Sequence, residues 1–540
     1  MSPTEPRWDF IIVGAGSAGC ALAHRLSESG RFRVLLLEAG PSDRNVWIQM
    51  PIGYGKTFYN ARLNWMYRSE PVPGLDGRTL YVPRGKVLGG SSAINAMVYS
   101  RGQPADFDDW EAQGNPGWGW RDVLPFYRKL EDHTLGESAL HGAGGPVHVD
   151  DISGEAHPLT HAFVKAGQEA GLPFNPDLNG ASQEGVGYYQ LNTRGGFRVS
   201  AARAYLRGAR ANLRIETGAL ATRILFDGKR ATGIVYERSG ATLEAYAGRE
   251  VILAGGAINS PQLLQLSGVG PAELLRSCGI AVHHDSPAVG RHLHDHLCHD
   301  YVYRSRQPSL NDVLLPWSGR IVVGLRYILT RRGPLALSVN QGGGFYRTDA
   351  TQRRPNMQLY FSPMSYERAV PGVRALMKPD PFSGFSTSVS PCQPTSRGYL
   401  QIRSADAKDP PAIFPNLLAT EHDVAEMLAG VKFLRRLAAA ASFAALIDEE
   451  LKPGPQAQSD DALIADIRAR AYSVFHPCGT CRMGPEPRAA VVDHRLRVHG
   501  LAALRVVDAS IFPAVTSGNT NAPAIMVGEK GAALILEDYK

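Results

Sequence analysis

The stretch Asp9 to Gly19, which reads DFIIVGAGSAG, decides the fold. It begins with the short β-branched run of a buried parallel strand, and a G-x-G-x-x-G turn then leads into a helical stretch. A second buried strand follows at Arg33 to Leu37, and Glu38 stands at its carboxyl end. This order predicts the βαβ start of a Rossmann-type α/β domain that binds a dinucleotide.

Each glycine of the turn has a physical role. Gly14 permits the tight turn, Gly16 lets the backbone approach a pyrophosphate, and Gly19 lets helix and strand pack closely. Glu38 lies roughly 20 residues further on, where an acid accepts hydrogen bonds from the adenosine ribose, and we expect this contact to be its only role. The motif alone does not separate FAD from NAD.

Length and composition indicate an ordinary globular enzyme. The chain has 540 residues, of which 44% are hydrophobic and 20% charged, and its formal net charge is +6. A single core rarely exceeds about 250–300 residues, so we expect two domains. Acidic and basic residues alternate throughout, which argues against a nucleic-acid partner. The 6 scattered cysteines are too few for a disulfide scaffold and indicate reduced thiols.

The apolar segments favour a cytoplasmic protein. Met1 to Trp8 is polar and holds no apolar stretch of the kind found in signal peptides. The longest apolar helical run, Leu437 to Ile447, is too short to span a bilayer. Leu314 to Leu335 is apolar with interspersed arginines. It is either a basic amphipathic element in peripheral contact with the inner face of the membrane or a domain helix with a solvated arginine face.

Five further segments carry a family resemblance. They are Arg84–Asn95 (RGKVLGGSSAIN), Gly256–Gly270 (GAINSPQLLQLSGVG), Val289–His296 (VGRHLHDH), His476–Gly484 (HPCGTCRMG) and Gly518–Pro523 (GNTNAP). With the N-terminal turn, they resemble in wording and order the signatures of the glucose–methanol–choline (GMC) oxidoreductase family. Gly89–Tyr99 and His476–Gly484 are most similar to bacterial alcohol and choline dehydrogenases.

The resemblance implies an α/β fold, in which a Rossmann-type FAD-binding domain carries an inserted substrate domain built on an antiparallel sheet with helices. We expect the FAD-binding domain at 1–155, 197–300 and 468–540, and the substrate domain at 156–196 and 301–467.

The cofactor that the resemblance implies is non-covalent FAD. Some family members attach FAD through a histidine in the loop where this chain has Ile94, which cannot form such a link. Backbone at Gly89 and Gly90 would lie flat against the isoalloxazine ring, where a Cβ would clash. The implied contacts are Gly14, Gly16, Ser17, Ala18, Gly19, Glu38, Ala39, Arg84, Val87, Gly89, Gly90, Ser91, Asn95, Ala96, Met97, Val98, Ala221, Ala254, Gly255, Asp508, Ala509, Asn519 and Thr520.

Two residues are implied to be catalytic. His476 falls on the family's catalytic histidine, and its unperturbed pKa suits a general base near neutral pH. Asn519 falls on the second active-site position, where an amide can hold the substrate oxygen; it also suits a turn or an N-cap before the last helix. The implied reaction is oxidation of a primary alcohol to the aldehyde, with hydride transfer to flavin N5.

The alternatives are a lyase or decarboxylase that retains FAD, and a flavin protein without catalysis. The electron acceptor is oxygen, a quinone or another acceptor. The motifs specify neither the particular alcohol nor the oligomeric state.

Two motifs have the spacing of metal or redox sites. Cys478 and Cys481 form a C-x-x-C pair, and His292, His294 and His296 alternate as ligands on a strand would. No second C-x-x-C is present in the sequence, and the matching family loops are structural, so we expect no metal.

Overall fold

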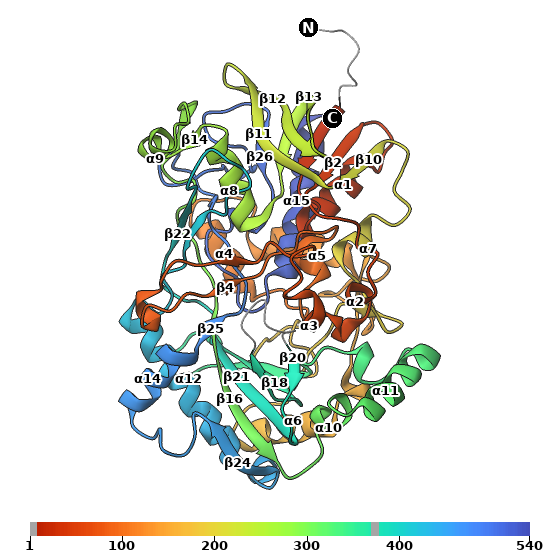
Figure 1. Cartoon of the computed structure of the whole chain (residues 1–540), viewed down its shortest axis with the longest axis vertical. Coiled ribbons are helices and arrows are strands. Elements are labelled where there is room, and N and C mark those ends of the chain that lie inside the picture. Colours follow the sequence, from red (N-terminus) through yellow and green to blue (C-terminus); the bar gives the residue numbers. More distant parts are fainter. Residues whose placement is uncertain (1–7, 369–376) are drawn as a thin grey trace.

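The computed structural model describes residues 8–368 and 377–540, in which two large sheets lie towards opposite ends of the long axis (Figure 1). The first is a seven-stranded sheet with the order β10-β2-β1-β13-β12-β11, in which β26 also pairs with β13. β1 (Trp8–Val13) lies in parallel between β2 (Val34–Glu38) and the last residues of β13 (Ala241–Leu253). β10 (Leu213–Thr217) and β26 (Leu504–Val506) extend the parallel part on either side.

One long strand joins this parallel part to an antiparallel part. The first residues of β13 pair with β12 (Arg230–Arg238), which in turn pairs with β11 (Ala219–Asp227). The central strands β1 and β2 are buried, as their apolar runs predict.

Helices begin where the parallel strands end. α1 (Ser17–Ser27) follows β1, and α8 (Gly256–Leu266) follows β13. The last helix, α15 (Asn521–Asp538), packs against α1, and at Gly528 an added Cβ would lie 2.6 Å from the carbonyl oxygen of Ala18. Close packing therefore brings the start of α15 to the carboxyl edge of the sheet, which is where ligands bind in folds of this type.

The second sheet is antiparallel and has seven strands, in the order β24-β16-β21-β18-β17-β7, with β25 also paired to β16. Its strands are β7 (Gly185–Tyr188), β16 (Leu297–Ser305), β17 (Gly342–Tyr346), β18 (Met357–Ser362), β21 (Gly384–Pro391), β24 (Ile447–Lys452) and β25 (Tyr472–Ser473). The helices around it are α6 (Pro158–Glu169), α12 (Glu421–Ala439), α13 (Ala441–Ala444) and α14 (Asp460–Arg470). Buried Phe163, Phe361, Phe385 and Phe443 form part of the core between them.

The other elements lie outside the two large sheets. The helices among them are α2 (Val46–Gln49), η1 (Pro51–Gly53), α3 (Tyr54–Thr57), η2 (Pro73–Leu75), η3 (Gly90–Ala93), α4 (Pro104–Ala112), α5 (Trp120–Leu130), η4 (Ser153–Glu155), α7 (Ala201–Tyr205), α9 (Ala272–Ser277), α10 (Leu310–Leu314), α11 (Trp317–Thr330), η5 (Pro334–Ala336) and η6 (Ala509–Ile511). The strands are β3 (Tyr67–Arg68), β4 (Tyr81–Val82), β5 (Glu131–His133), β6 (Val147–Val149), β8 (Thr193–Arg194), β9 (Phe197–Arg198), β14 (Val269–Gly270), β15 (His284–Asp285), β19 (Tyr366–Arg368), β20 (Met377–Pro379), β22 (Tyr399–Gln401) and β23 (Ala412–Phe414).

The predicted fold class is confirmed, with 31% helix and 26% strand. The exact domain boundaries remain a prediction; β16 begins at Leu297, before the predicted boundary at 301, and β25 lies beyond 467. Within the described residues, no helix combines the length and the apolar character needed to cross a membrane.

Candidate active site

The glycine turn after β1 is packed as tightly as its sequence predicts. Gly14 has a φ of +102°, and a Cβ there would lie 2.5 Å from the carbonyl oxygen of Ala254. A Cβ on Gly19 would lie 1.9 Å from the carbonyl oxygen of Gly14, so the helix packs directly on the turn. At Gly16, by contrast, the nearest atom would be 3.9 Å away. A side chain at Gly16 would therefore project into open space, which suits a backbone that a ligand must approach.

A first cavity, of about 140 Å³, lies over this turn. Many predicted cofactor contacts line it: Gly14, Gly16, Ser17, Ala18, Glu38, Ala39, Arg84, Gly90, Ser91, Ala221, Ala254, Gly255, Asp508 and Ala509. They come from the carboxyl ends of β1, β2 and β13, from β11, from the segment 84–91 after β4 and from the loop after β26. The parallel strands thus assemble residues that lie far apart in the sequence.

A second cavity, of about 580 Å³, adjoins the first, and Ser17, Arg84, Ser91, Pro477, Ala509 and Ala524 line both. Asn95, Ala96, Met97, Val98, His476, Asn519 and Thr520, all predicted site residues, line the second. The connected space runs from Glu38 to His476. A bare glycine floor and a continuous cavity of this kind fit an elongated dinucleotide such as FAD.

Three predicted contacts line neither cavity. Gly19 packs under the turn, Val87 is buried, and Gly89 lies against Ala202 and Ser200. Gly90 faces Gly16. A Cβ added at Gly90 would lie 2.7 Å from the Cα of Gly16, which is a second reason for glycine at position 90. Sequence reasoning omitted other lining residues, among them Trp65, Gly256, Asn259, Pro477, Asn521 and Ala524. Several of these residues lie inside or beside the quoted motifs, so their position in a motif could have identified them as lining residues.

Glu38 has a wider role than the sequence predicted. Its carboxylate accepts hydrogen bonds from the backbone N–H of Ala15, at 3.0 Å, and of Gly40, at 2.8 Å. Burial raises its pKa to about 7. The expectation that a ribose contact is its only role is therefore corrected, because the side chain also ties the glycine turn to the loop after β2.

Replacing Glu38 with Ala is expected to weaken FAD retention and to destabilise the turn. Each buried N–H left without an acceptor costs about 1–3 kcal/mol. FAD remaining after gel filtration, and urea unfolding of the apoprotein, measure the two effects. Glu38→Gln keeps one carbonyl acceptor and should retain more of both properties. FAD retention equal to wild type in Glu38→Ala would show that the acid does not hold the ribose.

Ile94 is buried with Ile48, Leu63, Val87 and Ala93. No nucleophilic side chain stands at this position, so we expect acid or heat to release FAD into the supernatant. Absorbance spectra of supernatant and pellet after precipitation check this. Flavin that remains with the precipitated chain would contradict it.

Two buried groups position His476. The carboxylate of Asp295 accepts the backbone N–H of His476 at 2.7 Å and the hydroxyl of Ser473 at 2.5 Å. The guanidinium of Arg84 donates to the carbonyl of Phe475 at 2.8 Å, where the backbone has a φ of +69°. These contacts hold the residue before Pro477 and direct its imidazole at the second cavity.

A hydrogen-bond chain decides which nitrogen of His476 is free. The carbonyl of Cys392 can only accept, so Nε2 of His296, 2.9 Å away, carries a proton. Nδ1 of neutral His296 is then an acceptor, and it lies 3.0 Å from Nδ1 of His476. His476 must donate there, which leaves its Nε2 unprotonated, with a lone pair that can accept a hydrogen bond. Burial lowers the pKa of His296 to about 4 and that of His476 well below 6.5, so both imidazoles are neutral.

Asn519 faces this lone pair. Its Nδ2 lies 3.2 Å from Nε2 of His476, and its Oδ1 accepts from Nε2 of Gln358 at 3.3 Å. The N-cap of α15 is Thr520, one residue later, so Asn519 is not the capping residue. In this structure the Asn519 N–H therefore donates to the Nε2 lone pair. A hydroxyl group that displaces this contact would find one acceptor, Nε2 of His476, and one donor, the amide of Asn519.

The C-x-x-C pair consists of buried free thiols. Burial raises the pKa of both Cys478 and Cys481, which keeps them protonated and unreactive near neutral pH. In the histidine run, both ring nitrogens of His296 are engaged as described, and the backbone N–H of His294 donates to the carbonyl oxygen of Cys478 at 3.0 Å. Both motifs support the loop that carries His476.

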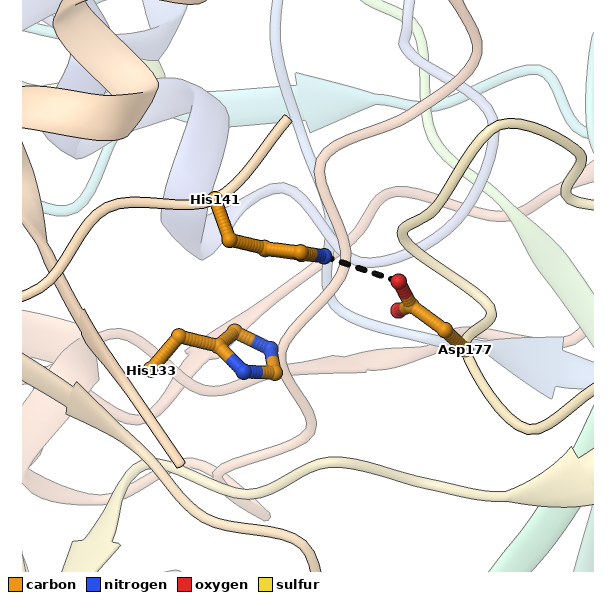
Figure 2. Close-up of side chains that lie close together, drawn as sticks. All are labelled: His133, His141 and Asp177. Atoms are coloured by element: carbon orange, nitrogen blue, oxygen red, sulfur yellow. Dashed lines mark hydrogen bonds and ion pairs between the residues drawn. The ribbon is translucent and has the colours of Figure 1, made fainter. Parts of the chain in front are cut away.

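A different group, which the sequence analysis did not single out, has the composition of a metal site (Figure 2). The possible ligand atoms of His133, His141 and Asp177 lie within 4.8 Å of one another, and Nε2 of His141 is 2.8 Å from Asp177. However, Nδ1 of His133 accepts the N–H of Leu135 at 3.1 Å, so Nε2 carries the proton in the neutral ring. A protonated nitrogen cannot ligate a metal, and this arrangement suits a buried hydrogen-bond network.

A glycine-lined cavity that adjoins a second cavity with a neutral imidazole and an amide fits a dinucleotide-dependent enzyme. The chain belongs to the GMC oxidoreductase family: its N-terminal family model matches residues 8–298, and its C-terminal model matches residues 394–528. It is thus an FAD-binding enzyme that acts on CH–OH donors.

Its relatives cover almost the whole chain. It is 43% identical to an alcohol dehydrogenase [acceptor] of Pseudomonas putida, over 98% of this chain and 96% of that protein. It is also 43% identical to the mitochondrial choline dehydrogenase of Homo sapiens, over 99% and 90%. Among solved structures, pyridoxine 4-oxidase from Mesorbium loti is 33% identical with a TM-score of 0.88, covering 98% of this chain and 99% of that one.

Proposed function

We propose that this protein oxidises a primary alcohol to its aldehyde, with His476 as the base. The observation that carries the proposal is the unprotonated Nε2 of His476, which lies at the second cavity and accepts from the amide of Asn519. FAD, when bound, would supply the hydride acceptor, its N5 atom, for the hydrogen on the carbinol carbon. The alcohol thus loses a proton to Nε2 of His476 and a hydride to the cofactor, and the C–O bond becomes a carbonyl.

His476 and Asn519 divide the work on the hydroxyl group. Nε2 of His476 takes the proton, while the amide N–H of Asn519 donates to the oxygen and holds it in place. A positioned base contributes roughly 10²–10⁴ to the rate. The hydrogen bond of Asn519 also favours the negative charge that develops on the oxygen as the proton leaves.

The primary-alcohol specificity rests on the likeness of Gly89–Tyr99 to alcohol and choline dehydrogenases, and relatives with those names support it. Aromatic side chains line part of the second cavity, including Tyr54, Phe58, Tyr59, Tyr360 and Phe475, and charged side chains such as Arg68, Arg78 and Asp300 line it as well. Oxygen, a quinone or another acceptor would then reoxidise the flavin.

Anaerobic mixing of the holoprotein with a panel of alcohols tests the proposal. Primary alcohols should bleach the flavin absorbance, while matched secondary alcohols, acids and alkanes should not. A decarboxylase, a lyase or a non-catalytic flavin protein would leave the flavin oxidised with every alcohol. Turnover with oxygen compared with a quinone then identifies the acceptor.

We also propose peripheral contact with a membrane, which helix α11 would make.

A further inference from the structure

Helix α11 (Trp317–Thr330) turns an apolar face away from the protein. It projects at the edge of the molecule (Figure 1). Trp317 and Leu329 expose 76% and 80% of their surface, and Ile321, Val322, Leu325 and Ile328 are also exposed. At about 100° per residue, these six positions fall within an arc of about 140° that only Ser318 interrupts. Exposed large apolar side chains gathered in this way mark an interaction surface.

The opposite face holds the helix in this orientation. Val323 and Tyr327 are buried, and the hydroxyl of Tyr327 donates to the carbonyl of Gly196 at 2.9 Å. The ring of Tyr327 also meets Phe197 edge to face. Because the inner face is anchored by its own contacts, the outer apolar face is a fixed feature of the surface.

Positive charge borders the apolar arc. Arg320 and Arg326 fall on its two sides. Arg331 and Arg332 follow the helix, where Arg331 stacks on Phe197 and Tyr327 and Arg332 pairs with Glu155 at 3.5 Å, so Arg320 and Arg326 supply the charge at the border. Positions 313–332 contain no Asp or Glu. An apolar stripe between arginines is the pattern of helices that lie in the interface of an anionic bilayer. We propose that α11 docks the protein on an anionic phospholipid membrane, with its apolar side chains in the acyl boundary and its arginines at the headgroups.

The alternatives fit the surface less well. A helix of 14 residues is about 21 Å long, so α11 is too short to span a bilayer. In a two-fold contact between two copies, the arginines of one α11 would lie near those of the other. α11 has no Asp or Glu that could pair with them, so these like charges would repel. Anionic lipid supplies the opposite charge along the whole border.

The docked face is next to the substrate cavity. Leu310 and Leu314 of α10, the helix directly before α11, pack in one cluster with Tyr54 and Tyr366. Both tyrosines line the second cavity. Docking would therefore bring this wall of the cavity towards the lipid. The docking itself is independent of the proposed alcohol oxidation, because binding is measured without turnover.

Co-sedimentation of the holoprotein with vesicles tests the proposal. The wild type should sediment with vesicles of phosphatidylcholine and phosphatidylglycerol, should bind phosphatidylcholine alone far less, and should dissociate as salt rises. The variant Ile321→Ser/Leu325→Ser/Leu329→Ser should bind at least about 10-fold more weakly. Arg320→Gln/Arg326→Gln should lose about 10-fold or more on anionic vesicles only. A matched control, Val46→Ser/Leu135→Ser/Leu243→Ser, changes exposed apolar residues elsewhere and should bind as the wild type does.

Flavin absorbance and bleaching by a soluble alcohol verify that each variant is folded. If the serine variant does not fold, the Arg320→Gln/Arg326→Gln variant alone tests the proposal. Failure of the wild type to bind anionic vesicles would overturn the proposal, as would wild-type binding by both α11 variants. So would a dimer that the serine variant disrupts, without vesicle binding, because α11 would then be a contact between copies. Vesicle binding without flavin bleaching would leave the docking in place and refute the alcohol oxidation alone.

Discussion

His476→Ala should slow flavin reduction by an alcohol by roughly 10²–10⁴ while FAD stays bound. The lone pair that takes the hydroxyl proton disappears with the imidazole, and Asn519 beside it carries an amide, which cannot act as a base. Substrate binding should change less than the rate, because proton removal belongs to the transition state. Stopped-flow absorbance under anaerobic conditions measures both.

Asn519→Ala is the matched control at the same site. It removes the donor to the substrate oxygen but leaves the base, so reduction should slow less than in His476→Ala. Near wild-type reduction in His476→Ala, together with its loss on replacement of another His or Lys, would refute the assignment of the base.

The same experiment has a defined pH dependence. The base works only when unprotonated, so the rate of reduction rises with pH as His476 loses its proton. Burial lowers the pKa of His476 well below 6.5, so the rise should lie on the acid side of 6.5, with a plateau at neutral pH. This rise should remain in Asn519→Ala and vanish in His476→Ala.

Replacing His296 with Ala should slow reduction by about 10–100-fold, which is the usual effect of removing the partner that orients a functional imidazole. His296 does not line either cavity and acts through His476 as a positioning residue. Without its acceptor, Nδ1 of His476 no longer has to carry the proton, and the free lone pair on Nε2 is lost in part of the molecules. The acid-side rise in rate should also move to higher pH, because burial of His476 is relieved.

Two conservative variants separate positioning from packing. Asn at position 296 places a carbonyl oxygen where Nδ1 stood and should restore most of the rate. Gln at position 296 reaches the Cys392 carbonyl instead and should restore little, although it is equally polar. Equal rates and pH profiles in the Asn, Gln and Ala variants would show that the contact with His476 has no role in reduction.

Much of the fold and part of the site could be predicted from the sequence. The stretch Asp9–Gly19, with the apolar run before Glu38, is sufficient to predict the βαβ start, because buried strands, a glycine turn and a helix are each local consequences of residue type. The family motifs likewise identified His476, Asn519 and most of the residues that line the cavities. These signals are local, so they could be recognised without any knowledge of packing.

Only the tertiary structure decided which groups meet. His296 and His476 are 180 positions apart, and the protonated nitrogen of each follows from the distant carbonyl of Cys392. The sequence suggested a ligand or a structural residue at His296, since a histidine's tautomer depends on neighbours that only folding supplies.

Glu38 and α11 show the same division. The position of Glu38 after a strand predicted an acid at the nucleotide site, while its contacts with Ala15 and Gly40 needed the folded turn. The sequence of α11 predicted a helix that carries both apolar residues and arginines. It left open whether this helix contacts a membrane or packs in the protein with its arginines in solvent. Packing through Val323 and Tyr327 decided that the apolar arc faces outward, because periodicity defines the faces of a helix but only its neighbours determine which one is buried.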